Sequence, residues 1–567
     1  MTLDTTGQAP PAPSPLPIPP DFPFAWERPG DELLLWEREA MHMALQATAM
    51  DAFFQRQALA GAGRAFAGYD LPIRMRLATF HGWAYQSVSP VSHDPAELGR
   101  LGASAEQKLG ALVGHVMERW TEDWLPRVDA AVAEVDALDV DGGTDEELAE
   151  RLELTVARFA DIWEVHFQLV VPMLLGISLF DDMYREVLGG EVFEPFRLLQ
   201  GLESMSVTCD LRIAELARAA RGADDVRAVL EQRLGADATR TALASSPAGR
   251  AFLEQLDAFL AEFGRRADAF TYVSLPSWRE DPSLVLGTIA DHLAQRDRDL
   301  AGEHRALAEE RDRSLADVRE RLASFPPEVQ GRFEGLLQAA TEGCMLQEDH
   351  NFWLDCRSID ATRRVVLGVG RRLAGNGALA AADDVFHLEP HEAAGALRGD
   401  DPARIRSLVA ERRDDLARFA DRPCPPVLGA LPPGPPPDDP IARTIMKMFG
   451  GPPREAEAPG ELAGRAGSPG TVRGTARVIR SLADAHRLAH GEILVAAMTS
   501  PPWTPLFGIA AAVVTDTGGI LSHCAVVARE YGIPAVVGTR AATASIRDGQ
   551  MVEVDGDEGV VRILPDA

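Results

Sequence analysis

The 567-residue chain has little lysine, little cysteine and no long apolar run. Its only lysines are Lys108 and Lys447, so 54 of its 56 basic residues are arginines (56 − 2). Its five cysteines are odd in number and lack a Cys-x-x-Cys spacing, which favours a reducing compartment over a disulfide framework or a zinc site. We therefore predict no metal site in this chain.

The N-terminus has neither the basic nor the apolar region of a signal peptide. The most apolar stretch, 167–180, is shorter than the roughly 20 residues that span a bilayer, and Pro172 interrupts it. These absences predict a cytoplasmic protein. The formal net charge of −30 repels nucleic acid phosphates and anionic lipid, so we expect neither nucleic acid nor a membrane as partner.

The first 422 residues divide into a proline-rich start and a long helical region. Residues 1–22 have almost no apolar pattern and predict a disordered lead-in. Residues 23–422 repeat apolar side chains at helical spacing, which predicts a large, mainly α-helical substrate-binding domain. Only the segment 71–88 favours strands, around a bend at Gly82.

A long charged helical hairpin is predicted near 284–373. Its first helix runs from 284 to 322, Pro326-Pro327 ends it, and the second helix, 327–373, returns antiparallel. The charged residues either face solvent or form an arm that binds a partner subunit.

The C-terminal part begins with a linker. Residues 423–460 hold two proline clusters, which predict a semi-rigid spacer. Residues 461–567 change to short apolar strands separated by glycines, which predicts a small α/β domain. The expected strands are 471–479, 493–496, 511–515, 535–537, 551–554 and 560–564, and the expected helices are 481–489 and 523–531.

His523 follows a Gly518-Gly519 turn and begins one of these helices. Ser522 suits the N-cap, and Gly532 suits the residue after the last turn. The first turn of such a helix offers free backbone N–H groups to an anion, and a neutral imidazole is a nucleophile near pH 7. We therefore predict a phosphoryl-carrying His523, with Thr515, Gly518, Gly519, Ser522 and Arg529 positioning the phosphate. The alternative for His523 alone is a capping or packing residue.

The wider sequence decides between these alternatives by resemblance. Thr515, Gly518-Gly519, His523 with Ala525-Val526-Val527-Ala528-Arg529, and the run Gly532-Ile533-Pro534-Ala535-Val536-Val537-Gly538 closely resemble the mobile, or swivelling β/β/α, domain of PEP-utilising enzymes. A second match, Gly467-Ser468-Pro469-Gly470 before Val472 and Gly474, resembles the first strand of that domain. The family includes phosphoenolpyruvate synthase and rifampicin phosphotransferase, and the resemblance implies that the matching histidine is phosphorylated.

The helical region also resembles a known kind of domain, through the run Asp21-Phe22-Pro23-Phe24-Ala25-Trp26-Glu27 and through Trp36 and His42. It is similar to the substrate domains of rifampicin phosphotransferase and of the histidine-bearing subunit of phenylphosphate synthase. No ATP-grasp pattern and no phosphoenolpyruvate-binding barrel is recognised in the sequence. The resemblance therefore implies a phosphotransferase component that an ATP-grasp partner charges with ATP and Mg²⁺, this chain binding no cofactor itself.

Candidates for the acceptor side are His81, Trp83, Arg265, Arg266 and His350. For each of them the alternative is a purely structural role, as a core or surface residue whose polar groups are already hydrogen-bonded. Two other functions stay open: a non-catalytic protein that sequesters a small molecule under a degenerate swivelling domain, and a ligase or dehydratase with a transient phosphohistidine.

Overall fold

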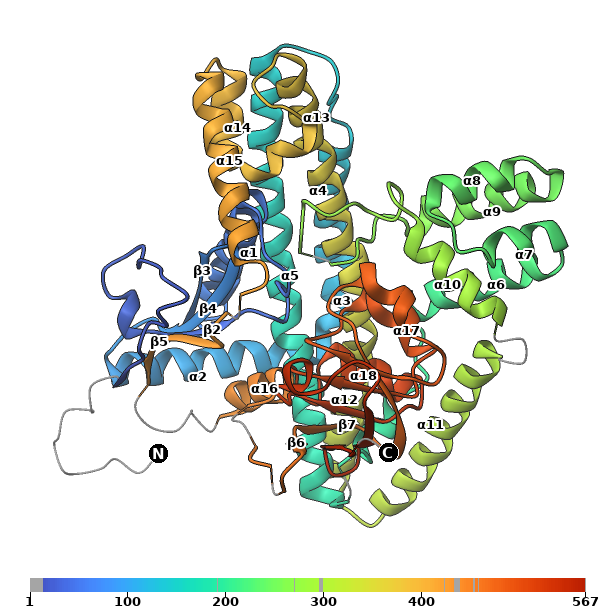
Figure 1. The fold of residues 1–567 in the computed structure, drawn as a ribbon. Coiled ribbons are helices and arrows are strands. Elements are labelled where there is room, and N and C mark those ends of the chain that lie inside the picture. The colour runs from blue at the N-terminus through green and yellow to red at the C-terminus, as the bar shows by residue number, and fades with distance from the viewer. Residues whose placement is uncertain are drawn as a thin grey trace.

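The computed structural model describes residues 14–190, 192–269, 271–294, 299–422, 424–432, 439–451, 454–456 and 458–565. Figure 1 shows a tall helical tower, a helical subdomain beside it, and a C-terminal α/β domain packed below and in front of them. The predicted fold class, a large helical domain and a small α/β domain, is confirmed.

A five-stranded sheet lies at the base of the tower, in the order β1-β5-β2-β4-β3. Its strands are β1 Ser14–Pro15, β2 Leu35–Arg38, β3 Ile73–Phe80, β4 Trp83–Pro90 and β5 Val427–Leu431. Gly82 has φ +78° in the turn between β3 and β4, which confirms the predicted bend. The disordered lead-in is wrong for residues 14–22, because β1 pairs with β5 and Phe22 is fully buried against aromatic neighbours. Residues 1–13 lie outside the described residues.

The tower is built around one long helix, α5 Asp145–Leu188. Thr144 and Glu147 form a capping box at its start, and Pro172 lies inside it without ending it, contrary to the predicted interruption. α5 holds an 18-residue window apolar enough to cross a membrane, but 67% of that window is buried in this fold, as in a core helix of a globular protein. The other tower helices are α1 Ala49–Gly68, α2 Pro95–Leu112, α3 Val116–Arg119, α4 Leu125–Asp136, α12 Pro327–His350, α13 Arg357–Gly375, α14 Pro390–Leu397 and α15 Pro402–Phe419.

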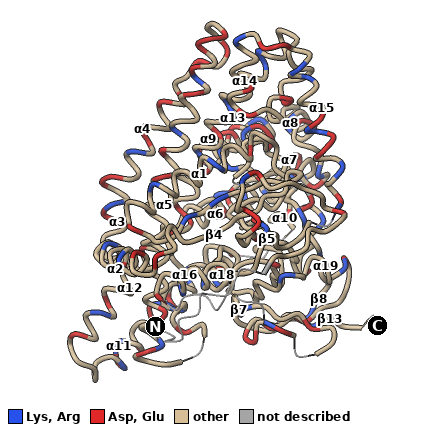
Figure 2. Tube along the Cα trace, turned by 90° about the vertical axis from the view of Figure 1, so that its left-hand side faces the viewer, with Lys and Arg blue, Asp and Glu red and all other residues tan. Residues whose placement is uncertain are grey.

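The predicted charged hairpin is wrong in its first half. α10 Ser283–Ala294 ends before α11 Leu300–Leu322 begins, and residues 295–298 lie outside the described residues. α10 packs its apolar side chains into the core of the helical subdomain, whose remaining helices are α6 Met205–Arg221, α7 Asp224–Leu230, α8 Ala236–Ala244 and α9 Pro247–Phe263. Only α11 has the expected charged surface, with basic and acidic residues along its length (Figure 2). The second half of the hairpin, α12 and α13, is joined by a π-helical segment, η5 Asn351–Cys356.

The linker 423–460 is not simply a spacer, which corrects that prediction. It contributes β5 to the N-terminal sheet and forms a helix, α16 Pro440–Phe449, which packs on α5. Asp439 caps α16 through a bond from the Ala442 N–H, and Gly450 ends it at φ +98°. The segment 433–438, which holds most of the first proline cluster, and Pro452-Pro453 lie outside the described residues.

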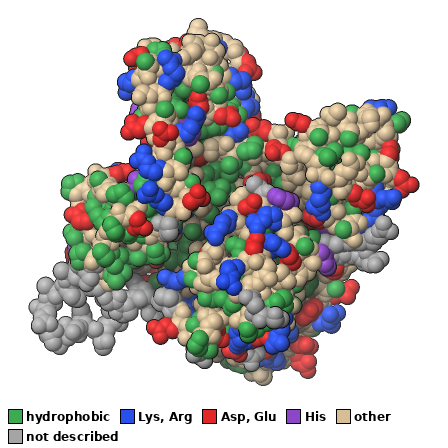
Figure 3. Space-filling view, viewed as in Figure 1, with side chains coloured by type: hydrophobic (Ala, Val, Ile, Leu, Met, Phe, Trp, Pro, Cys, Tyr) green, Lys and Arg blue, Asp and Glu red, His purple; other side chains and the backbone are tan. Residues whose placement is uncertain are grey.

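The C-terminal domain contains an eight-stranded sheet in the order β6-β13-β12-β8-β9-β10-β11-β7. The strands are β6 Glu461–Ala463, β7 Arg465–Ser468, β8 Thr471–Val478, β9 Ile493–Ala496, β10 Ala512–Thr515, β11 Ala535–Val537, β12 Met551–Asp555 and β13 Val560–Ile563. The six predicted strands are therefore confirmed within one residue at each end. β9, β10 and β11 are parallel, so the loops after β9 and β10 leave the same edge of the sheet. Figure 3 shows Lys and Arg side chains on the outer surface of this domain.

Candidate active site

His523 begins the helix α18 His523–Glu530, directly after the glycine loop that follows β10. Gly518 has φ +104°, which a residue with a side chain rarely adopts, and this lets the chain turn back toward the helix. Ser522 occupies the N-cap with extended backbone, and Gly532 has φ +61° after the last turn. His523 is therefore the first residue of a helix that directly follows the glycine loop, as the local signals in the sequence predict.

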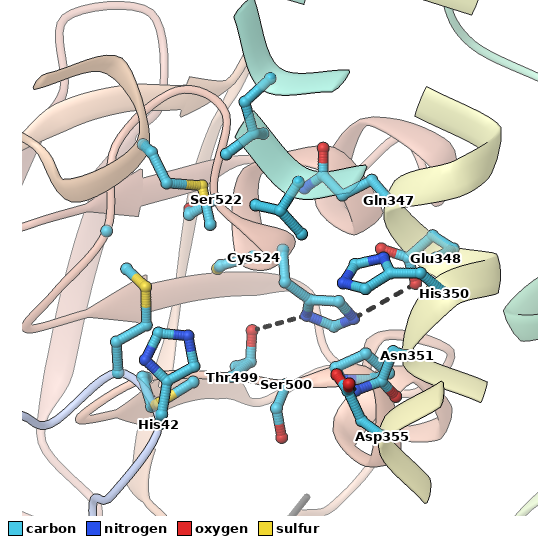
Figure 4. A pocket seen from close by; sticks show the side chains of 18 of the residues that line it. His42, Gln347, Glu348, His350, Asn351, Asp355, Thr499, Ser500, Ser522 and Cys524 are labelled. Carbon is cyan, nitrogen blue, oxygen red and sulfur yellow. Dashed lines mark hydrogen bonds and ion pairs between the residues drawn. The ribbon is translucent and has the colours of Figure 1, made fainter. Parts of the chain in front are cut away.

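The imidazole of His523 is nearly buried, with 11% of its side chain exposed. The Thr499 hydroxyl lies 3.3 Å from Nδ1, and the Thr504 hydroxyl lies 3.5 Å from Nε2. The nearest carboxylate oxygen, Glu348 Oε2, is 3.7 Å from Nε2 and comes from the helical domain. Figure 4 shows Thr499 and Glu348 on opposite sides of the ring, joined to it by dashed lines. Burial lowers the pKa of His523 to about 3, so the ring is neutral and nucleophilic at pH 7.

The cavity in front of His523 has a volume of about 110 Å³ and lies between the two domains. α12 contributes Gln347, Glu348 and His350, α5 contributes His166, and the loop after β9 contributes Thr499 and Ser500 among its lining residues. The Gln347 amide donates to the Leu521 carbonyl over 2.9 Å, so the C-terminal domain is hydrogen-bonded to α12 beside the site.

Glu348 is the most unusual acid of the cavity. One of its oxygens accepts a hydrogen bond from Ser206 over 2.8 Å, and the other, Oε1, is buried without a hydrogen-bond partner. Burial raises the pKa of Glu348 to about 7, although the Ser206 bond and the charge of Arg266 oppose this shift. The oxygen that accepts the Ser206 bond, Oε2, is also the one that lies 3.7 Å from His523 Nε2, so this carboxyl group is placed to exchange a proton with a molecule in the cavity.

The predicted phosphate-positioning residues have different surroundings. Gly518 and Ser522 line the cavity, and the Ser522 hydroxyl is buried without a hydrogen-bond partner, so it is free to bind an anion. The Thr515 hydroxyl instead donates to the Thr517 carbonyl within the loop. The Gly519 N–H donates to the Met448 carbonyl of α16 over 2.8 Å. Arg529 donates to the carbonyls of Gly467 and Ile520, and therefore braces the loop from behind.

Of the predicted acceptor-side residues, the structure brings only His350 into the cavity. His81 and Trp83 belong to the aromatic cluster at the N-terminal sheet, where His81 contacts Asp415 and stacks on Phe419. Arg265 forms ion pairs with acids of the tower. Arg266 is buried behind the cavity, among the rings of Phe263, Trp278 and Phe352, and one of its nitrogens, Nη1, lacks a hydrogen-bond partner.

His42, which the sequence singled out only through the resemblance of the helical region, also lines the cavity. The sequence singled out neither Thr504, which contacts Nε2, nor several lining residues: His166, Glu348, Asn351, Asp355, Thr499 and Ser500. A signal existed for Thr499 and Ser500, which follow β9 at the sheet edge where the loop after the parallel strand β10 also begins. Glu348 stands two residues before His350, but only the contact between the domains reveals its role.

The helix α16 holds the glycine loop in its place. The carbonyls of Lys447 and Met448 accept hydrogen bonds from the N–H groups of Leu521 and Gly519. The Lys447 ammonium in turn reaches α5, where it lies 2.8 Å from Asp181 Oδ2 and 2.7 Å from Asp182 Oδ1. Its side chain is 15% exposed and that of Asp181 only 2%, so this is a largely buried ion pair.

Replacing Lys447 with methionine is expected to lower the free energy of unfolding by roughly 2–4 kcal/mol, because it leaves buried carboxylates without their cation. Arg185 also pairs with Asp181, which keeps the loss at the lower end of that range. Urea denaturation and limited proteolysis at the linker 423–460 measure the effect. The other lysine gives a matched control, since Lys108 forms an exposed pair with Asp70, and Lys108→Met should leave both measurements unchanged. Equal behaviour of the two variants contradicts the assignment of α16 as the anchor of the loop.

Comparison with known proteins agrees with this geometry. Residues 488–559 match the mobile domain of PEP-utilising enzymes, and residues 166–348 match the fourth domain of rifampicin phosphotransferase. The chain is 37% identical to chondramide synthase cmdD of Chondromyces crocatus, over 100% of the chain and 14% of that protein. It is 28% identical to the uncharacterized phosphotransferase YvkC of Bacillus subtilis (strain 168), over 74% of the chain and 50% of that protein. It is 31% identical to a rifampicin phosphotransferase of a Streptomyces species, over 68% of the chain and 43% of that protein.

The chain thus spans half or less of the length of each of these relatives. The two matched regions are the ones that meet at the cavity, since 166–348 ends at Glu348 and 488–559 contains His523. By these matches, the chain contains the mobile domain of PEP-utilising enzymes and a region similar to the fourth domain of rifampicin phosphotransferase.

Proposed function

We propose that this chain carries a phosphoryl group on His523 and passes it to a small molecule bound in the cavity against α12. The observation that carries the proposal is the position of His523: a neutral, nearly buried imidazole faces a cavity whose other wall belongs to a different domain. A separate ATP-grasp protein with ATP and Mg²⁺ supplies the phosphoryl group, in an arrangement in which the C-terminal domain has left α12.

The chemistry follows from the groups around the ring. The lone pair of a ring nitrogen attacks the donor phosphorus and forms an N–P bond, while the P–O bond of the donor breaks and its electron pair leaves with the donor oxygen. In the docked state an acceptor oxygen attacks the same phosphorus, the N–P bond breaks, and the imidazole recovers its lone pair. Glu348 lies beside Nε2 and accepts the proton of the acceptor hydroxyl.

The experiment uses the purified full chain and two phosphoryl donors. Phosphoramidate tests the histidine without any partner, and ATP labelled at the β or the γ position tests each ATP-grasp protein of the source organism. We expect one acid-labile, base-stable phosphate, which mass spectrometry of the intact peptide places on His523. Label on another residue, or no label from either donor, overturns the carrier role. Label from phosphoramidate but from no ATP-grasp protein overturns only the donor assignment.

A further inference from the structure

A cluster of three buried ligand-type side chains forms part of the cavity wall opposite His523. His166 comes from α5, His350 from the end of α12, and Asp355 from η5, and all three line the cavity. Each offers one nitrogen or oxygen atom, and these atoms all lie within 4.8 Å of one another. Ligands of one ion at about 2.1 Å lie roughly 3–4 Å apart, so small side-chain rotations complete such a set.

The π-helical segment η5 brings two of the three residues together. His350 and Asp355 are five positions apart, which in an α-helix of 3.6 residues per turn points them about 140° away from each other. In a π-helix the backbone hydrogen bonds join residues i and i+5, so His350 and Asp355 lie on nearly the same face of the segment. Such segments are rare and are frequently found at functional sites, because a regular helix is the more stable alternative.

The hydrogen bonds around the cluster prepare it for a cation. His350 Nδ1 lies 2.7 Å from the Leu346 carbonyl, which can only accept, so Nδ1 carries the proton and Nε2 keeps its lone pair. The Asn351 amide donates to Asp355 Oδ2 over 3.2 Å and holds the carboxylate. His166 Nδ1 lies 2.9 Å from Asp355 Oδ1, which places the second imidazole against the same carboxylate.

A cavity that receives a phosphoryl group needs positive charge to balance the charge of the phosphoryl oxygens. Among the described residues that line it there is no lysine and no arginine, whereas Glu348 and Asp355 are carboxylates. The buried guanidinium of Arg266 does not line the cavity, although its charge acts on Glu348 and opposes the rise in the pKa of that carboxyl group. Transfer of a phosphoryl group depends mainly on positioning and on stabilisation of the charge on its oxygens, which cations provide. Of the described side chains that line the cavity, only His42 is a candidate cation, because against the effect of burial Glu39 and Asp355 raise its pKa, and it is already paired with Glu39.

We propose that His166, His350 and Asp355 bind one divalent transition-metal cation, such as Mn²⁺ or Zn²⁺, at the cavity wall. Two imidazoles and one carboxylate are a ligand set that such ions accept, with the remaining coordination positions directed to the cavity. The binding of the cation is independent of the proposed phosphotransfer. Its task there, to bind the oxygens of the transferred phosphoryl group, rests on that proposed function.

The sequence alone shows no sign of this site, and we predicted none. His166 and Asp355 are 189 residues apart, and His350 and Asp355 lack the spacing of a ligand pair on a regular helix. Only the packing of α5 against η5 unites them.

Titration of the EDTA-treated, metal-free chain with Mn²⁺, followed by electron paramagnetic resonance, tests the proposal without any activity assay. Mn²⁺ prefers oxygen and imidazole ligands, so the five free cysteines do not compete for it. We expect one Mn²⁺ per chain, displaced by Zn²⁺, and an affinity lowered about 100-fold or more in His350→Gln and in Asp355→Asn.

Two control variants test whether the ion is held by these three residues and not by other histidines. His523→Asn should keep the Mn²⁺ affinity, so its loss in that variant would assign the ion to the other side of the cavity. The exposed His391→Ala should also leave it unchanged. Circular dichroism checks that each variant is folded. Absence of stoichiometric Mn²⁺ binding to the wild type, or equal affinity in Asp355→Asn, overturns the proposal and leaves His166 and Asp355 as a structural pair.

Discussion

An asparagine in place of His523 is expected to reduce acid-labile phosphate on the chain to background, whichever donor is used. An amide nitrogen has no available lone pair, so it cannot form the N–P bond, whereas its size and polarity suit the pocket between Thr499 and Thr504. The loss should therefore be complete while the fold is kept. Phosphoramidate labelling followed by ³¹P NMR measures it, and His490→Asn, at an exposed position of the same domain, is the control that should keep full label.

The same variant has a second expected signature, in the dependence of stability on pH. The pKa of His523 falls to about 3 in the fold, against about 6.5 in the unfolded chain. The unfolded state therefore binds the extra proton first, and the wild type loses about 1.4 kcal/mol of stability per pH unit as the pH falls from 6.5 toward 3. His523→Asn removes this contribution. Urea unfolding at pH 7 and pH 5 should show a smaller pH effect in the variant by roughly 2 kcal/mol, and an equal effect argues against a buried neutral imidazole.

The C-terminal domain could be predicted from its sequence because its signals are local. Six of its eight strands were predicted as short, mainly apolar runs near glycines, and Ser522 and Gly532 mark both ends of the helix that carries His523. β6 and β7 were missed, because Glu461 and Arg465 interrupt the apolar pattern of these two short strands. The helix α16 also had local signals, since Asp439 and Pro440 suit its first positions and Gly450 its end. The prolines on both sides of these signals favour a spacer when the composition of the whole segment 423–460 is considered.

The acceptor side of the site could not be predicted in the same way. Glu348 and His350 lie on a helix whose sequence is compatible with an ordinary amphipathic surface, and their position depends on how the C-terminal domain packs on α12. His81 and Arg265 are the opposite case, because they were predicted for the acceptor side from their residue type. In the structure they form ion pairs with Asp415 and Asp136, away from the cavity. Long-range packing, rather than residue type, decides which polar groups face the cavity.

Replacing Glu348 with glutamine is expected to leave phosphorylation of His523 intact and to slow the second half of the reaction by about 10²–10⁴-fold, the range that a general base contributes. In the proposed cycle the phosphohistidine forms away from α12, so Glu348 takes no part in that step. Transfer to a hydroxyl needs a proton acceptor beside Nε2, and Glu348 Oε2 is the carboxylate oxygen found there, 3.7 Å away. Glutamine keeps the side-chain volume and can still accept the hydrogen bond of Ser206.

The measurement is the single-turnover loss of phosphate from the pre-labelled full chain, with phenol and glycerol as hydroxyl-bearing probes. Loss of the carboxylate charge also weakens repulsion of the phosphoryl group. The phosphoryl oxygens carry their charge in the ground state and in the transition state alike, so this effect largely cancels in the rate constant at saturating probe. Glu342→Gln is the matched control, because Glu342 lies on the same helix outside the cavity lining, where it accepts a hydrogen bond from Gln338. If both variants transfer phosphate at the wild-type rate, Glu348 is a wall of the cavity, and the proton must leave through another group.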